Sequence, residues 1–110
     1  MKFLCLAYGD EAGWKALGAD EQAALLAQDE VMRQRGDIVA AVSPAAITVH
    51  AWDGTATVTD GTYARSDRPL AGFGIIEAAD LNEAIRLVAD TPCARAHGAV
   101  ELRPIAAINL

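Results

Sequence analysis

A strongly patterned hairpin signal in the middle of the chain restricts the possible folds more than any other feature. Residues 47–59 alternate in polarity on both sides of Asp53-Gly54, a dipeptide typical of two-residue turns with positive φ at both positions. The predicted pairs are Thr48 with Thr59, Val49 with Val58, and His50 with Thr57. This register makes one face of the ribbon apolar and places threonine, histidine and tryptophan on the other. A shift by one residue would mix the two faces, so turn and pattern predict the same register.

Apolar segments of strand length surround the ribbon, and amphipathic segments lie between them. Strands are predicted at residues 3–8, 37–42, 70–77 and 99–105. A short helix is predicted over 11–17, a longer one over 19–35, and a third from 81 until Thr91-Pro92 ends it. The residues predicted to face the core are Leu25, Leu26 and Met32 in the longer helix, and Leu81, Ala84, Ile85 and Val88 in the third.

The order of these elements predicts an α+β fold, namely a ferredoxin-like βαββαβ plan with an added β-hairpin, in one domain spanning residues 1–110. Both long helices would cover the same face of the sheet. Gly72 and Gly74 would share one face of their strand, where a helix or a ligand can approach the backbone closely. Several strands are apolar on both faces, so we expect a second copy to cover the remaining face in a homodimer.

Composition excludes several classes of function. The net charge is −6 and the nine Lys and Arg residues are scattered, which argues against nucleic-acid and anionic membrane partners. Cys5 and Cys93 stand far apart without further ligands at metal spacing, so no metal site is predicted. No glycine loop for phosphate precedes a helix, so no cofactor is predicted. The first apolar run is too short for a signal peptide or membrane span, which favours a cytoplasmic protein.

Several stretches together resemble a known family. They are Lys2-Phe3-Leu4-Cys5-Leu6-Ala7-Tyr8-Gly9-Asp10-Glu11, Glu21-Gln22-Ala23-Ala24-Leu25, Thr59-Asp60-Gly61-Thr62-Tyr63, Gly72-Phe73 and Gly98-Ala99-Val100-Glu101-Leu102-Arg103-Pro104-Ile105. In order and spacing they resemble the YCII-related proteins, in particular the DGPF subgroup, whose Asp-Gly-Pro-Phe signature is represented here by residues 60–63. The resemblance implies a dimeric α+β barrel whose two sheets enclose a cleft, and relatives often encoded beside extracytoplasmic-function sigma factors.

The broader YCII-like proteins have a suspected pair of His and Asp residues. The aligned positions in this chain are Leu25 and Thr91, neither of which transfers a proton at neutral pH. The resemblance therefore implies that this acid-base pair is absent here, and that other residues would have to supply any such chemistry.

A pocket is predicted near residues 59–65, where a glycine turn stands beside acidic, phenolic and guanidinium groups. The candidate catalytic residues are His50, Asp60 and Tyr63, as acid, base or orienting groups. The candidate ligand-binding residues are Tyr8, Asp10, Asp29, Trp52, Gly61, Arg65 and Arg68. Structural alternatives remain open, because Asp60 is an ordinary turn former and both His50 and Asp29 suit solvated positions.

The leading functional hypothesis is a homodimer that binds a small polar or anionic organic ligand in its inter-sheet cleft, as an accessory or sensor protein. One alternative is an isomerase, lyase or dehalogenase type of enzyme that uses acid-base chemistry at the cleft. Another is a protein that acts only by association, for example with a sigma factor. The polarity and volume of the cleft would discriminate among the three.

Overall fold

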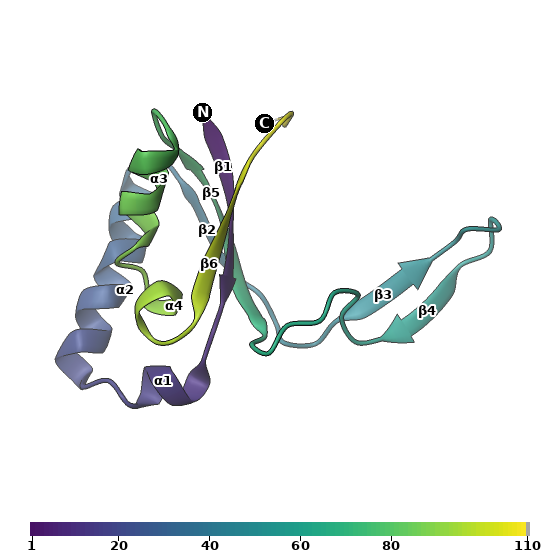
Figure 1. The fold of residues 1–110 in the computed structure, drawn as a ribbon, viewed down its shortest axis with the longest axis horizontal. Helices are drawn as coiled ribbons and strands as arrows, with labels where there is room; N and C mark the ends of the chain where they lie inside the picture. The colour runs from purple at the N-terminus through teal and green to yellow at the C-terminus, as the bar shows by residue number, and fades with distance from the viewer. Residues whose placement is uncertain (110) are drawn as a thin grey trace.

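In the computed structural model, which describes residues 1–109, a four-stranded sheet is covered on one face by helices, and a separate two-stranded hairpin extends away from it (Figure 1). The elements are β1 (Lys2–Tyr8), α1 (Glu11–Lys15), α2 (Ala19–Gln34), β2 (Ile38–Ala41), β3 (Ile47–His50), β4 (Thr57–Asp60), β5 (Leu70–Glu77), α3 (Leu81–Val88), α4 (Pro92–Arg95) and β6 (Ala99–Pro104). We call the four-stranded sheet and its helices the body, and residues 47–60 the arm.

The strands of the body follow the order β2-β5-β1-β6, and each neighbouring pair is antiparallel. This is the ferredoxin-like arrangement, with the arm inserted between β2 and β5. The predicted α+β class and the βαββαβ plan with an added hairpin are therefore confirmed. Both long helices lie on one side of the sheet, as expected (Figure 1).

The core lies between the helices and the sheet. Strand alternation turns Phe3 and Cys5 of β1 toward the helices, and Ile76 of β5 is the register partner of Phe3. Met32 from α2 and Val88 from α3 complete this buried cluster. Complete burial of a side chain as large as Phe3 or Ile76 contributes about 1.5–3 kcal/mol, so these two residues anchor the helix layer.

Side-chain capping and glycine conformation define the helix ends. The Asp10 carboxylate accepts a hydrogen bond from the Gly13 amide (3.0 Å) at the start of α1, and Asp80 caps α3 through the Glu83 amide (2.8 Å). Gly36, with φ of 93°, follows the end of α2, which was predicted to end at residue 35. The short helix α4 was not predicted, because a proline at the first helical position was interpreted only as the end of α3.

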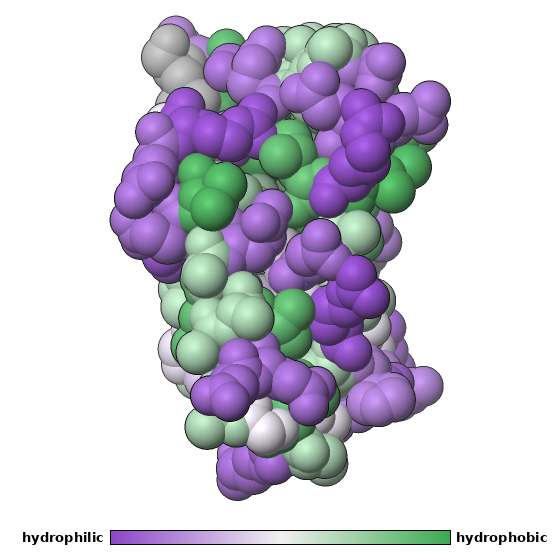
Figure 2. Space-filling view, turned by 90° about the vertical axis from the view of Figure 1, so that its left-hand side faces the viewer, coloured by the Kyte–Doolittle hydropathy of each residue, from purple (hydrophilic) through white to green (hydrophobic). Residues whose placement is uncertain are grey.

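The predicted core residues of the helices are partly wrong. Met32, Ala84 and Val88 are buried, whereas Leu26, Leu81 and Ile85 are exposed. Leu26 lies about 240° around α2 from Met32, and Ile85 about 100° around α3 from Ala84, so neither faces the sheet. Leu81 shares the buried side of α3 but stands at its first residue. The outer face of the helix layer consequently shows separate hydrophobic patches among hydrophilic side chains (Figure 2).

The opposite face of the sheet is not covered by any element of the described chain. Its apolar side chains are Leu4 and Leu6 from β1, Phe73 and Ile75 from β5, and Ile38 from β2. We call this set the open sheet face. Within the described chain β1 is covered on the helix side, and Leu4 and Leu6 stay half-exposed on the other. Covering of that face by a second copy stays a prediction.

The arm has the predicted register but a different turn. Thr48 pairs with Thr59, Val49 with Val58 and His50 with Thr57, as expected. The prediction of a two-residue turn at Asp53-Gly54 is wrong. Of these two residues only Gly54 has positive φ (87°), and the pairing of β3 with β4 ends at His50 and Thr57. The Gly54 amide instead donates to the Ala51 carbonyl (3.1 Å), and the Asp53 carboxylate accepts from the Thr55 amide (3.0 Å). Local side-chain hydrogen bonding thus stabilises a wider loop.

Candidate functional site

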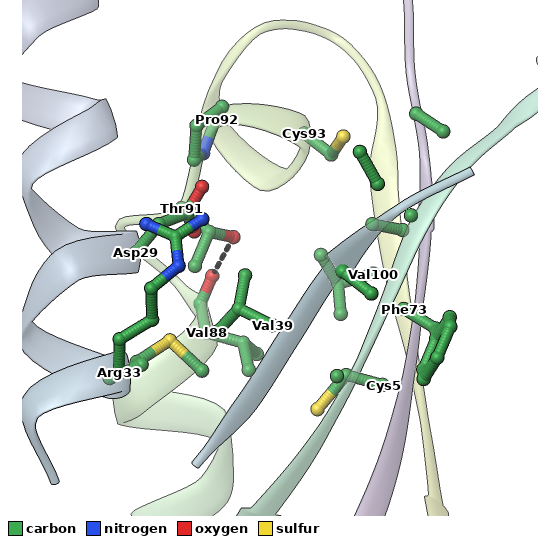
Figure 3. A pocket seen from close by; sticks show the side chains of 17 residues that line it. Cys5, Asp29, Arg33, Val39, Phe73, Val88, Thr91, Pro92, Cys93 and Val100 are labelled. Atoms are coloured by element: carbon green, nitrogen blue, oxygen red, sulfur yellow. Dashed lines mark hydrogen bonds between the residues drawn. The ribbon is translucent and has the colours of Figure 1, made fainter. Parts of the chain in front are cut away.

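A cavity of about 180 Å³ lies between α2, the α3–α4 connection and the helix-facing side of the sheet (Figure 3). Its walls come from segments far apart in sequence. They include Cys5 and Ala7 of β1, Asp29, Met32 and Arg33 of α2, Val39, Ala40 and Ala41 of β2, residues 71–74, Val88, Thr91, Pro92, Cys93 and Val100. The lining is largely apolar, and its few polar side chains cluster at the helix side.

Two glycines of β5, Gly72 and Gly74, form part of the cavity wall. A Cβ atom on Gly72 would overlap the carbonyl oxygen of Ala40, and one on Gly74 would lie 3.1 Å from the carbonyl oxygen of Ile38. Glycine is therefore required at position 72 because β2 approaches β5 closely, and it also leaves the adjoining cavity unfilled.

Asp29 is the acidic residue of the cavity. It is half-buried on α2, and burial raises the pKa of its carboxyl above the usual 3.8, while the positive charge of Arg33 partly opposes that rise. Figure 3 shows both side chains at the helix side of the cavity, with Thr91 beside them. Asp29 therefore retains its proton to higher pH than a fully solvated aspartate does, and it can donate or accept a hydrogen bond there.

The hydroxyl and thiol groups of the cavity are not activated as nucleophiles. The Thr91 hydroxyl donates to the Val88 carbonyl (2.6 Å, dashed in Figure 3), so its proton is already engaged. Burial, followed by the charge of Asp29, raises the pKa of the Cys93 thiol. Burial and the charge of Asp37 raise the pKa of Cys5 to about 11. Both cysteines are therefore thiols at neutral pH, and the thiolate needed for attack is scarce.

The three candidate catalytic residues lie on the arm or just after it, outside the cavity. The ring of His50 is 4.6 Å from that of Trp52 and 5.7 Å from that of Tyr63, measured between centroids. Trp52 is 89% exposed and Tyr63 is 78% exposed. Asp60, the last residue of β4, is also exposed. The structure brings the aromatic rings together but does not enclose them.

Arg68 and Asp10 form a contact where the chain returns from the arm to the body. Their side chains are 3.2 Å apart, between Arg68 Nη2 and Asp10 Oδ2. The hydrogen bond from the Gly13 amide, and then the nearby Arg68 guanidinium, lower the pKa of Asp10. Tyr8 is half-buried at the end of β1, whereas Gly61 and Arg65 are exposed beyond β4.

Of the candidate residues predicted from sequence, Asp29 lines the cavity and the others lie on the arm, in the loop after it, or at the body's edge. Sequence reasoning missed Arg33 and Cys93 as lining residues. Arg33 is one helical turn after Asp29, which is a recognisable spacing, but nothing in the sequence links either residue to Cys93.

Among residues 1–109, no three His, Cys, Asp or Glu side chains gather closely enough to hold a metal ion. Within the same residues, no helix combines the length and the apolar character that a membrane span requires.

The sheet order, the helix layer and the cavity define an α+β protein of ferredoxin-like plan. The chain belongs to the YCII-related domain family, whose model matches residues 1–109. The fold is similar to that of 5-chloro-2-hydroxyhydroquinone dehydrochlorinase from Burkholderia phenoliruptrix AC1100, solved in complex with 2,5-dihydroxybenzoquinone. That match has 20% identity and a TM-score of 0.49, and it covers 96% of this chain and 93% of the dehydrochlorinase. No curated protein matches the sequence. Membership of the DGPF subgroup stays a prediction.

Proposed function

We propose that this YCII-related protein binds a small organic molecule in the cavity beside α2, as an accessory or sensor protein. The observation that carries the proposal is a largely apolar cavity with a half-buried carboxyl, Asp29, at its helix side. Apolar pockets with few polar groups are typical of small-molecule sites. The inter-sheet cleft expected from the family resemblance needs a second copy and stays a prediction.

Volume and polarity define the class of ligand. An engineered apolar cavity of about 150 Å³ binds benzene, so about 180 Å³ is sufficient for one substituted ring. A protonated Asp29 donates a hydrogen bond to a carbonyl oxygen, and an ionised Asp29 accepts one from a hydroxyl. The ligand is therefore a single-ring compound that carries a hydroxyl or carbonyl group. The polar or anionic character predicted from sequence is restricted to one end of such a molecule.

Binding is tested by thermal unfolding with phenol, catechol, benzaldehyde and benzoate. At about 100 times its Kd, a ligand that binds only the folded state raises Tm by roughly 10 °C. Asp29→Ala should reduce this shift, because it removes the only carboxyl that the described residues contribute to the cavity, and with it both the hydrogen-bond donor and the acceptor. Ala41→Leu should reduce it by filling the cavity from β2.

Asp60→Ala is the matched control, because Asp60 lies on the arm and does not line the cavity. It should leave the shift unchanged. If no compound raises Tm, the binding proposal is wrong. If Asp60→Ala abolishes the shift and Asp29→Ala does not, the site predicted from sequence near residues 59–65 replaces the cavity.

An enzyme of isomerase, lyase or dehalogenase type is the second candidate, and the raised pKa of Asp29 favours it. Acid-base catalysis is most efficient when the pKa of the catalytic group is close to the working pH. Exchange of an acidic C–H proton of a bound carbonyl compound in D₂O, followed by NMR, measures such transfer. Asp29→Asn should slow the exchange by about 100-fold. Exchange no faster than in buffer would exclude this candidate and leave binding alone.

A further inference from the structure

Thr91 is the most deeply buried polar side chain in the wall of the cavity. It is 8% exposed, whereas Asp29 is half-buried and Arg33 is exposed. A hydroxyl that is removed from water is costly unless it forms hydrogen bonds. The bonding of Thr91 therefore determines what the interior of the cavity can offer a ligand.

The hydroxyl proton of Thr91 is held by the backbone of the chain. It is donated to the Val88 carbonyl over 2.6 Å, at the short end of the range for such bonds (Figure 3). The Thr91 amide donates to the same carbonyl over 3.1 Å, and Pro92 fixes the backbone at the start of α4. Because this turn holds the side chain in place, Thr91 has no proton to give to a ligand.

The oxygen of Thr91 keeps its capacity to accept. Thr91 is the N-cap of α4, a position at which a threonine oxygen ordinarily accepts from one of the next amides. Within residues 1–109, that capping bond does not form. A hydroxyl oxygen has two lone pairs, so Thr91 Oγ1 is a buried acceptor that no capping amide uses.

The other two polar groups at the helix side have less definite roles. Asp29 donates when it is protonated and accepts when it is ionised. Arg33 is a donor, but its side chain is 50% exposed and its Nη1 atom lies 3.5 Å from Glu30 Oε2. A cation in such a solvated position contributes little to binding. Of these three side chains, Thr91 thus combines burial with one fixed role, that of acceptor.

We infer that Thr91 Oγ1 accepts a hydrogen bond from a ring hydroxyl of the ligand, so that the cavity selects phenols over aromatic carbonyl compounds. This role of Thr91 rests on the proposed function and narrows its ligand class, which cavity volume and Asp29 leave open between hydroxyl and carbonyl. A phenol brings its donor to the unused acceptor. A carbonyl oxygen would face a second acceptor, and both oxygens would lose their hydrogen bonds to water.

Apolar side chains provide the contacts for the ring. Val39, Val88 and Val100 line the same cavity (Figure 3). A hydroxyl that enters apolar surroundings without an acceptor binds poorly, because it gives up its hydrogen bonds to water. Thr91 removes this penalty for phenol. It offers no such gain to toluene, which carries a methyl group in place of the hydroxyl.

Isothermal titration calorimetry at pH 7 measures the Kd of phenol, toluene and benzaldehyde for the full chain and its variants. The wild type should bind phenol about tenfold more tightly than benzaldehyde. Thr91→Val replaces the hydroxyl with a methyl group of similar shape, and the Val88 carbonyl keeps its bond from the amide of residue 91. This variant should bind phenol about tenfold more weakly and toluene within about twofold of wild type. Thr91→Ser keeps the hydroxyl and should keep the binding of phenol.

Thr48→Val is the matched control. The Thr48 hydroxyl also donates to a backbone carbonyl, that of Gly61 (2.8 Å), but Thr48 lies on the arm and does not line the cavity. This variant should leave all three Kd values unchanged, and circular dichroism verifies that each variant is folded.

Three results would overturn the role of Thr91 and leave the proposed function standing. They are equal affinity of the wild type for phenol and benzaldehyde, an unchanged phenol Kd in Thr91→Val, and equal losses for phenol and toluene in that variant. The first needs no substitution, so it decides the question even if Thr91→Val does not fold. If none of the three compounds binds the wild type, the proposed function is wrong, and the role of Thr91 falls with it.

Discussion

The body and the arm require glycine for opposite reasons, and the contrast shows how each region is determined. In the body, a Cβ atom on Gly13, Gly72 or Gly98 would overlap a backbone carbonyl oxygen of a neighbouring segment. At the arm, Gly54 and Gly61 have φ of 87° and 104°, and a Cβ atom on either would have no neighbour within 4 Å beyond the adjacent residues. Packing therefore requires glycine in the interior of the body, whereas local backbone conformation requires it at the arm and at Gly36, just after α2.

Side-chain burial also differs between the body and the arm. Phe3 and Ile76 have almost no exposed surface, whereas the apolar side chains of the arm are more than half exposed. Substitutions that remove volume should therefore unfold the body and leave the isolated arm almost unchanged.

Phe3→Ala should have the largest effect. The loss of a completely buried ring should lower the free energy of unfolding by about 3–5 kcal/mol, as measured by urea denaturation. Val58→Ala, whose side chain is 62% exposed, should change it by less than about 0.5 kcal/mol. Similar losses for both variants would show that the arm is as tightly packed as the body.

Gly98→Ala should have an intermediate effect. Its methyl group would overlap the carbonyl oxygen of Tyr8, and relief of this overlap should cost about 2–3 kcal/mol. Gly54→Ala meets no neighbouring atom and should cost about 1 kcal/mol, from the positive φ alone. Thermal unfolding of both variants measures the two losses of stability. A larger loss for Gly54→Ala than for Gly98→Ala would contradict the view that packing limits the body and backbone conformation limits the arm.

Asp29→Asn should have the smallest effect, and its sign depends on pH. The pKa of Asp29 is raised in the folded chain, so the wild type loses stability as pH rises from 3.8 through the folded-state pKa. The variant cannot ionise, so it should be more stable than wild type at pH 7, by a few degrees in Tm, and no more stable near pH 3. A gain that persists at pH 3 would assign the effect to packing instead of charge.

The fold could be predicted from the sequence because its signals are local. Alternation predicts the register of Val49 with Val58, and the predicted starts of the helices at 19 and 81 agree with those of α2 and α3. The prediction of a two-residue turn at Asp53 is wrong because the Asp53 carboxylate accepts a hydrogen bond from the Thr55 amide, which stabilises a wider loop. An Asp-Gly pair is compatible with both conformations, so residue type alone does not decide between the tight turn and the wider loop.

The cavity could not be predicted because it depends on long-range packing. Asp29, Gly72 and Cys93 come from three separate elements, and only the folded sheet brings them around one space. Asp29 is recognisable as a candidate because it borders the apolar stripe of its helix, a local property. His50 and Tyr63 are candidates for their chemistry, and the structure brings their rings within 5.7 Å of each other on an exposed surface.

At the base of the arm, the Gly61 amide donates to the Ala46 carbonyl (2.9 Å) and the Thr48 hydroxyl donates to the Gly61 carbonyl (2.8 Å). No residue of the arm belongs to the buried core cluster of the described chain, so packing against the body does not fix the orientation of the arm. We therefore expect distances between spin labels at the tip of the arm and on the sheet to be more broadly distributed than distances between two labels on the sheet.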